Sequence, residues 1–139
     1  GIDVHMGAAK LTARDTVEVT AKDGKVSELK AKNIILATGA NPIVIPGVTV
    51  DGEKVVTYSE AIVQTKLPKS AVIIGGGAIG VEFATVWSAY GAQVTIVEML
   101  PRIVPLEDEE VSSELSKSFQ KRGIQVLAGT KVLSVETVA

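Results

Sequence analysis

Three glycines with a fixed spacing are the residues of this chain best suited to bind a ligand. Gly75, Gly77 and Gly80 form the pattern G-x-G-x-x-G, and an acid, Glu98, closes the apolar run that follows. Glycines at a strand-to-helix turn leave main-chain N–H groups free to bind phosphates, and the positive end of the helix dipole favours the anion. A carboxylate at the end of the second strand accepts hydrogen bonds from ribose hydroxyls and repels a 2′-phosphate. The arrangement predicts an NAD site, with NAD preferred over NADP.

The segments around these glycines follow the order strand, helix, strand. The run AVIIG (71–75) predicts a buried strand, and QVTIVE (93–98) predicts a second one. Between them we expect a helix from about Ala78 to Tyr90, with Gly91 as its C-terminal stop. A lone glycine motif is weak evidence, but this order is the context that a Rossmann nucleotide-binding unit requires.

Each glycine has its own mechanical reason in this interpretation. We expect Gly75 to permit the tight turn, Gly77 to leave room for a pyrophosphate, and Gly80 to let the helix pack closely on the strand. The alternative is that the glycines serve only a close turn. A P-loop is excluded because no Gly-Lys-Ser/Thr follows, and a kinase loop is excluded because this loop opens a helix.

The helix after the turn carries one charged candidate and several apolar ones. Glu82 lies beside the expected anion site, where it either points along the cleft or is a solvated partner of the helix dipole. The sequence leaves both roles open. The apolar side chains of this helix are predicted to pack in the core rather than to touch a cofactor. They are Ile79, Phe83, Val86, Trp87 and Tyr90.

A second helix and a third strand are expected after Glu98. The helix should run from about Glu107 to Arg122, because acidic residues open it and basic residues end it, as the helix dipole favours. The strand is IQVLAG (124–129). The inward stripe of the helix is predicted to be Val111, Leu115 and Phe119.

The first 40 residues have a different texture. The alternating run TVEVT (16–20), the turn at Asp23-Gly24 and the returning run 25–32 predict a small antiparallel meander. The continuous apolar run NIILATG (33–39) predicts a strand buried on both faces. A connector with several Pro and Gly turn signals follows over 41–68, with Ser59 as the expected cap of a short helix.

Composition bounds the class of protein. The chain has 139 residues, of which 46% are hydrophobic, and its net charge is −2, so we expect a globular domain without a nucleic-acid role. It contains no cysteine, which excludes a disulfide framework or a zinc–thiolate site in these residues. No apolar run is long enough for a membrane span and no signal peptide opens the chain, so a cytoplasmic (or mitochondrial matrix) location is expected. The lone His5 is interpreted as a surface residue.

The combination of IILATGANPIVIPG, VIIGGGAIGVEFATVWSAYGAQVTIVE and GTKV resembles the flavoprotein disulfide reductases, also called pyridine nucleotide-disulfide oxidoreductases. The resemblance covers practically the whole chain. It implies an α/β fold: a Rossmann-like doubly wound parallel sheet for NAD over 69–139, incomplete at its C-terminus. A small β-rich remnant of a split FAD-binding domain, a β-meander plus the ATG strand, would precede it over 1–40. It also implies a hydride relay between NAD and FAD and electron transfer between the flavin and a redox disulfide.

The same resemblance assigns cofactor contacts position by position. Glu82 would lie near the nicotinamide, Glu98 at the adenosine ribose, and Val132 near the adenine. The whole turn implied to bind NAD is Gly75, Gly76, Gly77, Ala78, Ile79, Gly80, Val81 and Glu82. The implied FAD contacts are Ala9, Thr38, Gly39 and Ala40. No catalytic residue and no metal ligand is assigned, because the Cys-x4-Cys dithiol and the His and Glu acid–base pair of the family are absent.

Within the family, the sequence looks like the NAD-using branch that oxidises protein-bound dihydrolipoyl groups. Glutathione reductases tend to carry tyrosine at the position of Ala78 and alanine at that of Gly80. The implied partner is the lipoyl domain of a 2-oxoacid dehydrogenase or glycine cleavage complex, and the full-length enzyme is expected to be a homodimer. The alternatives that stay open are another enzyme of the family (mercuric reductase, soluble transhydrogenase or glutathione reductase) and a stand-alone, non-catalytic NAD-binding module.

Overall fold

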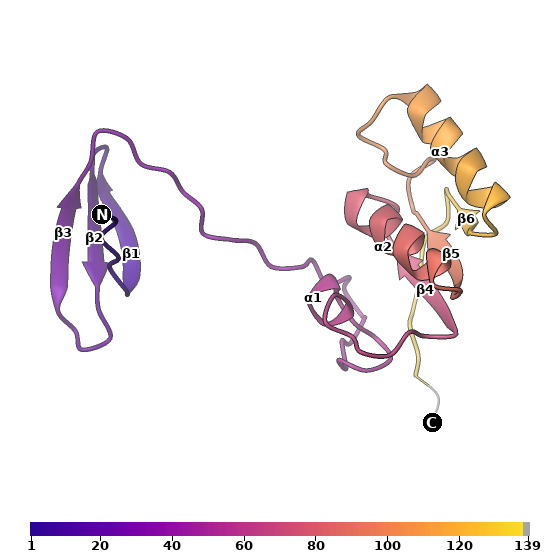
Figure 1. The fold of residues 1–139 in the computed structure, drawn as a ribbon, viewed down its shortest axis with the longest axis horizontal. Helices are drawn as coiled ribbons and strands as arrows, with labels where there is room; N and C mark the ends of the chain where they lie inside the picture. Colours follow the sequence, from indigo (N-terminus) through magenta and orange to yellow (C-terminus); the bar gives the residue numbers. More distant parts are fainter. Residues whose placement is uncertain (138–139) are drawn as a thin grey trace. The chain divides into compact units, whose positions relative to one another are not determined.

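The computed structural model describes residues 1–137, and Val138 and Ala139, the end of the expected NAD domain, lie outside the described residues. The chain divides into two compact units, Gly1–Ala40 and Asn41–Ala139 (Figure 1). The boundary lies at the end of the apolar ATG run. The assignment of the two units to FAD and NAD domains stays a prediction.

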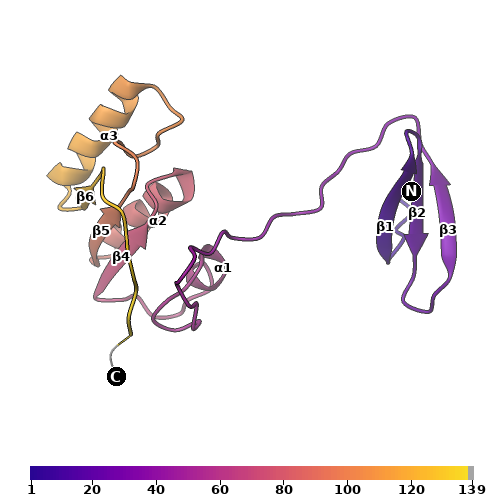
Figure 2. The same ribbon diagram turned by 180° about the vertical axis from the view of Figure 1, so that it is seen from behind.

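The first unit is a three-stranded antiparallel sheet. Its strands are β1 (Ala8–Ala13), β2 (Thr16–Thr20) and β3 (Val26–Lys30). Both views show β2 between β1 and β3 (Figures 1 and 2). Gly24 turns the chain between β2 and β3 with a φ of +82°, a conformation that glycine adopts without steric cost. The predicted meander is therefore confirmed.

The strand expected over residues 33–39 does not form. The segment has no regular structure, and the exposed fractions of Ile35 and Leu36 are 90% and 69%. A strand needs a neighbour to receive its main-chain hydrogen bonds, and within the described residues the first sheet ends at β3. An apolar run alone does not supply that neighbour, so the prediction of a strand buried on both faces was wrong here.

The second unit contains a parallel sheet. Its strands are β4 (Ser70–Ile74), β5 (Gln93–Val97) and β6 (Gln125–Leu127), in that order across the sheet. Helix α2 (Ala78–Ala89) connects β4 to β5, and α3 (Glu109–Lys121) lies between β5 and β6. This β-α-β-α-β order matches the α/β fold predicted from the sequence, with Gly91 at a φ of +96° ending α2 as expected.

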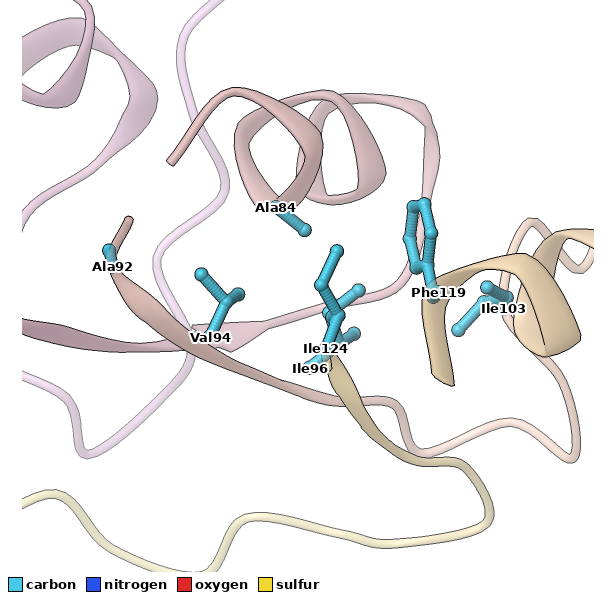
Figure 3. Close-up of a cluster of buried hydrophobic side chains, with 7 residues drawn as sticks. All are labelled: Ala84, Ala92, Val94, Ile96, Ile103, Phe119 and Ile124. Atoms are coloured by element: carbon cyan, nitrogen blue, oxygen red, sulfur yellow. The ribbon is translucent and has the colours of Figure 1, made fainter. Parts of the chain in front are cut away.

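The core of the second unit lies where both helices pack on the central strand. Ala84 of α2 and Phe119 of α3 are 0% and 1% exposed and meet Ile96 of β5, which is 0% exposed (Figure 3). The other face of the sheet is not covered in the same way, because Val72 is 66% exposed. The prediction that β4 is fully buried was therefore wrong, since the described chain packs helices on one face only.

Two predicted helix stripes need correction. On α2, Ile79 and Val86 are 52% and 48% exposed, and the C-cap residue Tyr90 is 75% exposed. Ala84 instead faces the core, with Val81 and Trp87 packed against it. The helix is apolar nearly all round, so periodicity could not identify its inner face.

On α3, Leu115 and Phe119 face the core as predicted, but Val111 is 56% exposed. The third inward residue is Ser112, which is 1% exposed. A search for apolar residues does not find a serine. The Ser112 hydroxyl donates a hydrogen bond to the Val104 carbonyl.

The short helix α1 (Tyr58–Ala61) begins after Thr57, not after Ser59. The hydroxyl of Thr57 accepts from the Ser59 N–H at 3.3 Å, while Glu60 accepts from the Thr57 N–H at 2.7 Å. This is a capping box, in which the threonine and the acid three residues later satisfy each other's free donors.

Candidate nucleotide-binding site

The site is the turn that joins β4 to α2. Gly75 has a φ of +109°, and its N–H donates to the Val97 carbonyl at 2.9 Å, so the turn continues the pairing of β4 with β5. Gly77 is the N-cap of α2, and no side chain caps this helix end. The first N–H groups of an α-helix have no partner within the helix. This turn therefore presents main-chain donors and the positive end of the helix dipole.

The four glycines of the turn differ in the reason why a side chain would not fit: the main-chain conformation, the packing or neither. Only Gly75 has a positive φ. A Cβ on Gly80 would overlap the Gly75 carbonyl oxygen, and one on Gly76 would lie 2.7 Å from Ile103 Cγ2. A Cβ on Gly77 would meet nothing within 4 Å. Three of the glycines are thus required by the fold, as predicted for Gly75 and Gly80, while Gly77 leaves open space where the helix begins.

Glu98 closes the turn from the next strand. Its side chain is buried, with 8% of the residue exposed. One carboxylate oxygen accepts from the Gly76 N–H at 2.6 Å, and the other accepts from the Leu100 N–H at 2.7 Å. A carboxylate has about four acceptor positions, so capacity remains for further donors. The acid and the glycine turn, which the sequence predicted to form one site, are therefore in direct contact.

The loop after Glu98 also contacts the turn, and the sequence interpretation missed it. The Val104 N–H donates to the Gly76 carbonyl at 2.6 Å, and Ile103 is fully buried against Gly76. Val104 has a φ of +41°, which is an outlier for a β-branched residue. Its sequence context, an apolar pair between two prolines, contains no pattern that predicts this contact.

Val132 lies near the same end of the sheet. The Thr130 N–H donates to the Glu98 carbonyl at 2.8 Å, and the Gly129 N–H donates to the Leu100 carbonyl at 2.8 Å. The segment that leads to Val132 is therefore fixed beside Glu98, and Val132 itself is half-buried. The structure brings together the turn, the acid and the segment that the sequence assigned to the adenosine half of NAD.

Glu82 lies on α2 beyond its first turn, and it is exposed. It borders an apolar groove of about 500 Å³ between α2 and the segment around α1. The groove is lined by Ala61, Ile62, Gln64, Thr65, Lys66, Leu67, Glu82, Phe83, Val86, Trp87 and Tyr90. Val86 and Tyr90 therefore line a groove instead of the core, whereas Trp87 borders the groove and also packs against the core.

The residues assigned to FAD lie in the first unit. Ala9 is in β1, where it pairs with Val19 of β2. Thr38, Gly39 and Ala40 follow in the segment without regular structure, and Gly39 has a φ of +79°. All four are exposed.

Other classes of site have no support in the part of the chain that the structure describes. No group of three or more His, Asp or Glu residues between positions 1 and 137 could hold a metal ion. Over the same residues, no helix has the length and apolar character needed to cross a membrane.

Comparisons with known proteins agree with the geometry. The sequence pattern of the family described as "Pyridine nucleotide-disulphide oxidoreductase" matches residues 1–139. Dihydrolipoyl dehydrogenase of Chlorobaculum tepidum is 49% identical over 134 residues, which cover 96% of this chain and 29% of the relative. Dihydrolipoyl dehydrogenase of Mycobacterium leprae is 46% identical over 137 residues, again 96% of this chain and 29% of the relative. This chain thus spans less than a third of the length of these curated relatives.

Solved structures show the same likeness. The crystal structure of LpdA from Mycobacterium tuberculosis superposes with a TM-score of 0.77 at 29% identity, covering 96% of this chain and 30% of that chain. The HOCl-induced flavoprotein disulfide reductase RclA from Escherichia coli superposes with a TM-score of 0.71 at 27% identity, covering 94% of this chain and 29% of that chain.

Proposed function

Since the chain belongs to the pyridine nucleotide-disulphide oxidoreductase family, we propose that it is the nucleotide-binding part of an enzyme that oxidises a protein-bound dihydrolipoyl group and reduces NAD. Dihydrolipoyl dehydrogenases of this family use FAD and NAD. The high identity to two such enzymes over 96% of this chain supports the choice of substrate. The proposed partner is the lipoyl domain of a 2-oxoacid dehydrogenase or glycine cleavage complex, and the proposed assembly is a homodimer of the full-length enzyme.

The turn between β4 and α2 is the proposed site of the NAD pyrophosphate. The observation that carries this assignment is the open space at Gly77, the one glycine of the turn that neither φ nor packing requires. Because Gly77 has no side chain, a phosphate can approach its main chain closely. There it meets the uncapped start of α2. The contacts would come from Gly75, Gly76, Gly77, Ala78, Ile79, Gly80 and Val81.

Glu98 and Val132 are proposed to bind the adenosine half. Glu98 keeps acceptor capacity beyond its two main-chain donors, and its negative charge disfavours a 2′-phosphate. Val132 would contact the adenine, because its segment is fixed beside Glu98. Glu82, on the other side of the turn, is proposed to lie near the nicotinamide.

FAD is proposed to bind along the first unit through Ala9, Thr38, Gly39 and Ala40. When bound, FAD passes electrons between the substrate dithiol and NAD. The positive φ of Gly39 supports a close approach of the main chain, since this conformation is strained for residues with a Cβ. The chain itself supplies binding surfaces and no side chain that makes or breaks a bond.

The direct test is a substrate comparison with the full-length flavoprotein that carries these residues. We expect NAD reduction with dihydrolipoamide as the electron donor to be far faster than NADPH oxidation with glutathione disulfide or Hg(II). A faster reaction with either of those acceptors, or with a second pyridine nucleotide, would assign the enzyme to another branch of the family. Nucleotide binding without turnover of any of them would favour a non-catalytic module.

The test is sharper with the Gly77→Ala variant. Reduction of the flavin by dihydrolipoamide takes place without NAD, so this half-reaction should keep its rate. Transfer from the reduced flavin to NAD should become limiting at ordinary NAD concentrations. A variant that lost both half-reactions equally would indicate general damage instead of a lost phosphate contact.

A further inference from the structure

Val104 is held in an unfavourable main-chain conformation by hydrogen bonds on both of its sides. Its φ of +41° places a β-branched residue in the left-handed region, which is sterically unfavourable for an L-residue. It is the one residue other than glycine with a positive φ among the residues that the structure describes. Such a conformation persists only where the surroundings enforce it.

The enforcing contacts come from α3 on one side and from the glycine turn on the other. The hydroxyl of Ser112, which is 1% exposed, donates to the Val104 carbonyl at 3.2 Å. The Glu107 N–H donates to the same carbonyl at 2.9 Å. The Val104 N–H donates to the Gly76 carbonyl at 2.6 Å.

Gly76 is thereby fixed at both of its main-chain polar groups. Its N–H donates to Glu98 at 2.6 Å, while its carbonyl accepts from Val104. Ile103 fills the space against the Gly76 Cα and is anchored in the core at 0% exposure. The conformation of the turn is therefore set from the core side, before any nucleotide contacts it.

We propose that Ser112 and Val104 are positioning residues for the nucleotide: they hold Gly76, and with it the glycine turn, in the conformation that leaves the start of α2 open to the pyrophosphate. The inference rests on the proposed NAD site and adds residues to it that touch no ligand. Without the Ser112 hydroxyl, the Val104 carbonyl keeps only the Glu107 donor. Val104 can then relax toward a negative φ, which shifts its main chain relative to Gly76. The turn then samples conformations that do not bind NAD. The apparent affinity for NAD falls in proportion to the fraction of the protein that keeps the binding conformation.

The test is the NAD dissociation constant of the full-length flavoprotein, measured by titration of the intrinsic fluorescence. The Ser112→Ala variant should bind NAD about two- to tenfold more weakly, the range expected for one lost hydrogen bond. Its neighbour Ser113 is exposed, so Ser113→Ala is the matched control and should keep the affinity of the unchanged protein. At saturating NAD the turnover rate of Ser112→Ala should be unchanged, and flavin reduction by dihydrolipoamide should not change either.

A double variant separates positioning from simple destabilisation. Glycine adopts a φ of +41° without strain, so Val104→Gly keeps the N–H in place without the help of Ser112. The effect of Ser112→Ala on NAD affinity should therefore shrink to less than about twofold in the Val104→Gly background, as a double-mutant cycle would record. A general loss of stability predicts that the two effects add.

The outcomes are distinct. A Ser112→Ala variant that melts earlier but binds NAD as tightly as the unchanged protein overturns the inference, and so do additive effects in the cycle. A protein with all native residues that does not bind NAD at all overturns the proposed NAD site itself, whatever the variants do.

Discussion

The Glu98 carboxylate and the Gly76 N–H form a 2.6 Å hydrogen bond across the turn that begins α2. The sequence predicts one role for Glu98, the binding of ribose hydroxyls, and the structure shows another within the protein. The carboxylate is buried and satisfies two main-chain donors, Gly76 and Leu100. The acid proposed to select the nucleotide thus also fixes the conformation of the turn.

The first prediction follows from these two bonds. A Glu98→Gln variant retains one carbonyl oxygen and brings an NH₂ group against a main-chain donor, so one of the two N–H groups loses its acceptor. We expect a loss of about 1–3 kcal/mol in the free energy of unfolding, together with weaker NAD binding. Urea denaturation and NAD titration measure the two effects.

The exposed Glu110 at the start of α3 offers a control, since Glu110→Gln should change stability by less than about 0.5 kcal/mol. If Glu98→Gln weakened NAD binding without any change in stability, Glu98 would serve the ligand alone. Glu98→Arg should raise the preference for NADPH over NAD, because arginine attracts the 2′-phosphate that the carboxylate repels. It should also lower the stability of the turn, because the two main-chain N–H groups lose their acceptor.

The second prediction separates two glycines of one motif. Alanine at position 77 meets no atom within 4 Å, whereas alanine at position 80 would overlap the Gly75 carbonyl. Gly77→Ala should therefore keep its melting temperature within a few degrees and lose NAD affinity at least tenfold, because the new methyl occupies the phosphate space. Gly80→Ala should lower the melting temperature markedly. If Gly77→Ala bound NAD tightly, the proposal that the pyrophosphate binds at this turn would be contradicted.

A third prediction concerns the inner face of α3. Phe119 is 1% exposed and packs with Ile96 and Ile124, while Val111 is 56% exposed. Phe119→Ala should cost about 3–5 kcal/mol of unfolding free energy, the usual cost of emptying a buried aromatic site. Val111→Ala should cost less than about 0.5 kcal/mol, as exposed positions do. If urea denaturation gave equal losses of unfolding free energy for the two variants, Val111 would face the core, as the periodicity predicted.

The fourth prediction is a pH dependence in the connector. Hydrogen bonds from the main-chain N–H groups of Val55, Glu53 and Lys54 hold the pKa of the Asp51 carboxyl below its ordinary value. A lowered pKa in the folded state means that the ionised acid stabilises this loop above the ordinary pKa. That contribution disappears as the pH falls through the lowered value.

The measurement is the amide signal of Val55 in an NMR titration. Its shift should follow the protonation of Asp51 and move at a pH below the ordinary pKa of aspartate. Asp51→Asn keeps a carbonyl acceptor but cannot titrate, so the same signal should stay constant over this range. A midpoint at or above the ordinary pKa would contradict the lowered value.

Local chemistry accounts for the elements that were predicted correctly. The turn at Gly24, the stop at Gly91 and the start of α2 at the glycine motif each depend on residues within a few positions of one another. The contact between Glu98 and the turn was also foreseeable, because the ends of adjacent parallel strands meet at one edge of the sheet. Short-range rules therefore located the turn, its helix and the strand that carries the acid.

Burial could not be predicted in the same way. The apolar run around Ile35 predicted a buried strand, yet burial requires a second surface, and in the first unit β3 ends the sheet. On α2, apolar residues surround the helix, so only packing against β5 decides that Ala84 faces inward and Tyr90 outward.

The sequence by itself determined a strand–turn–helix unit with a glycine at the sharp turn and an acid on the next strand. Only the tertiary structure decided that Gly76 is held between Glu98 and Val104, and that the Ser112 hydroxyl donates to the Val104 carbonyl. The physical reason is distance along the chain. Turns and caps are fixed by neighbouring residues, whereas a hydrogen bond between α3 and a loop, or between that loop and the glycine turn, exists only after the core has brought them together.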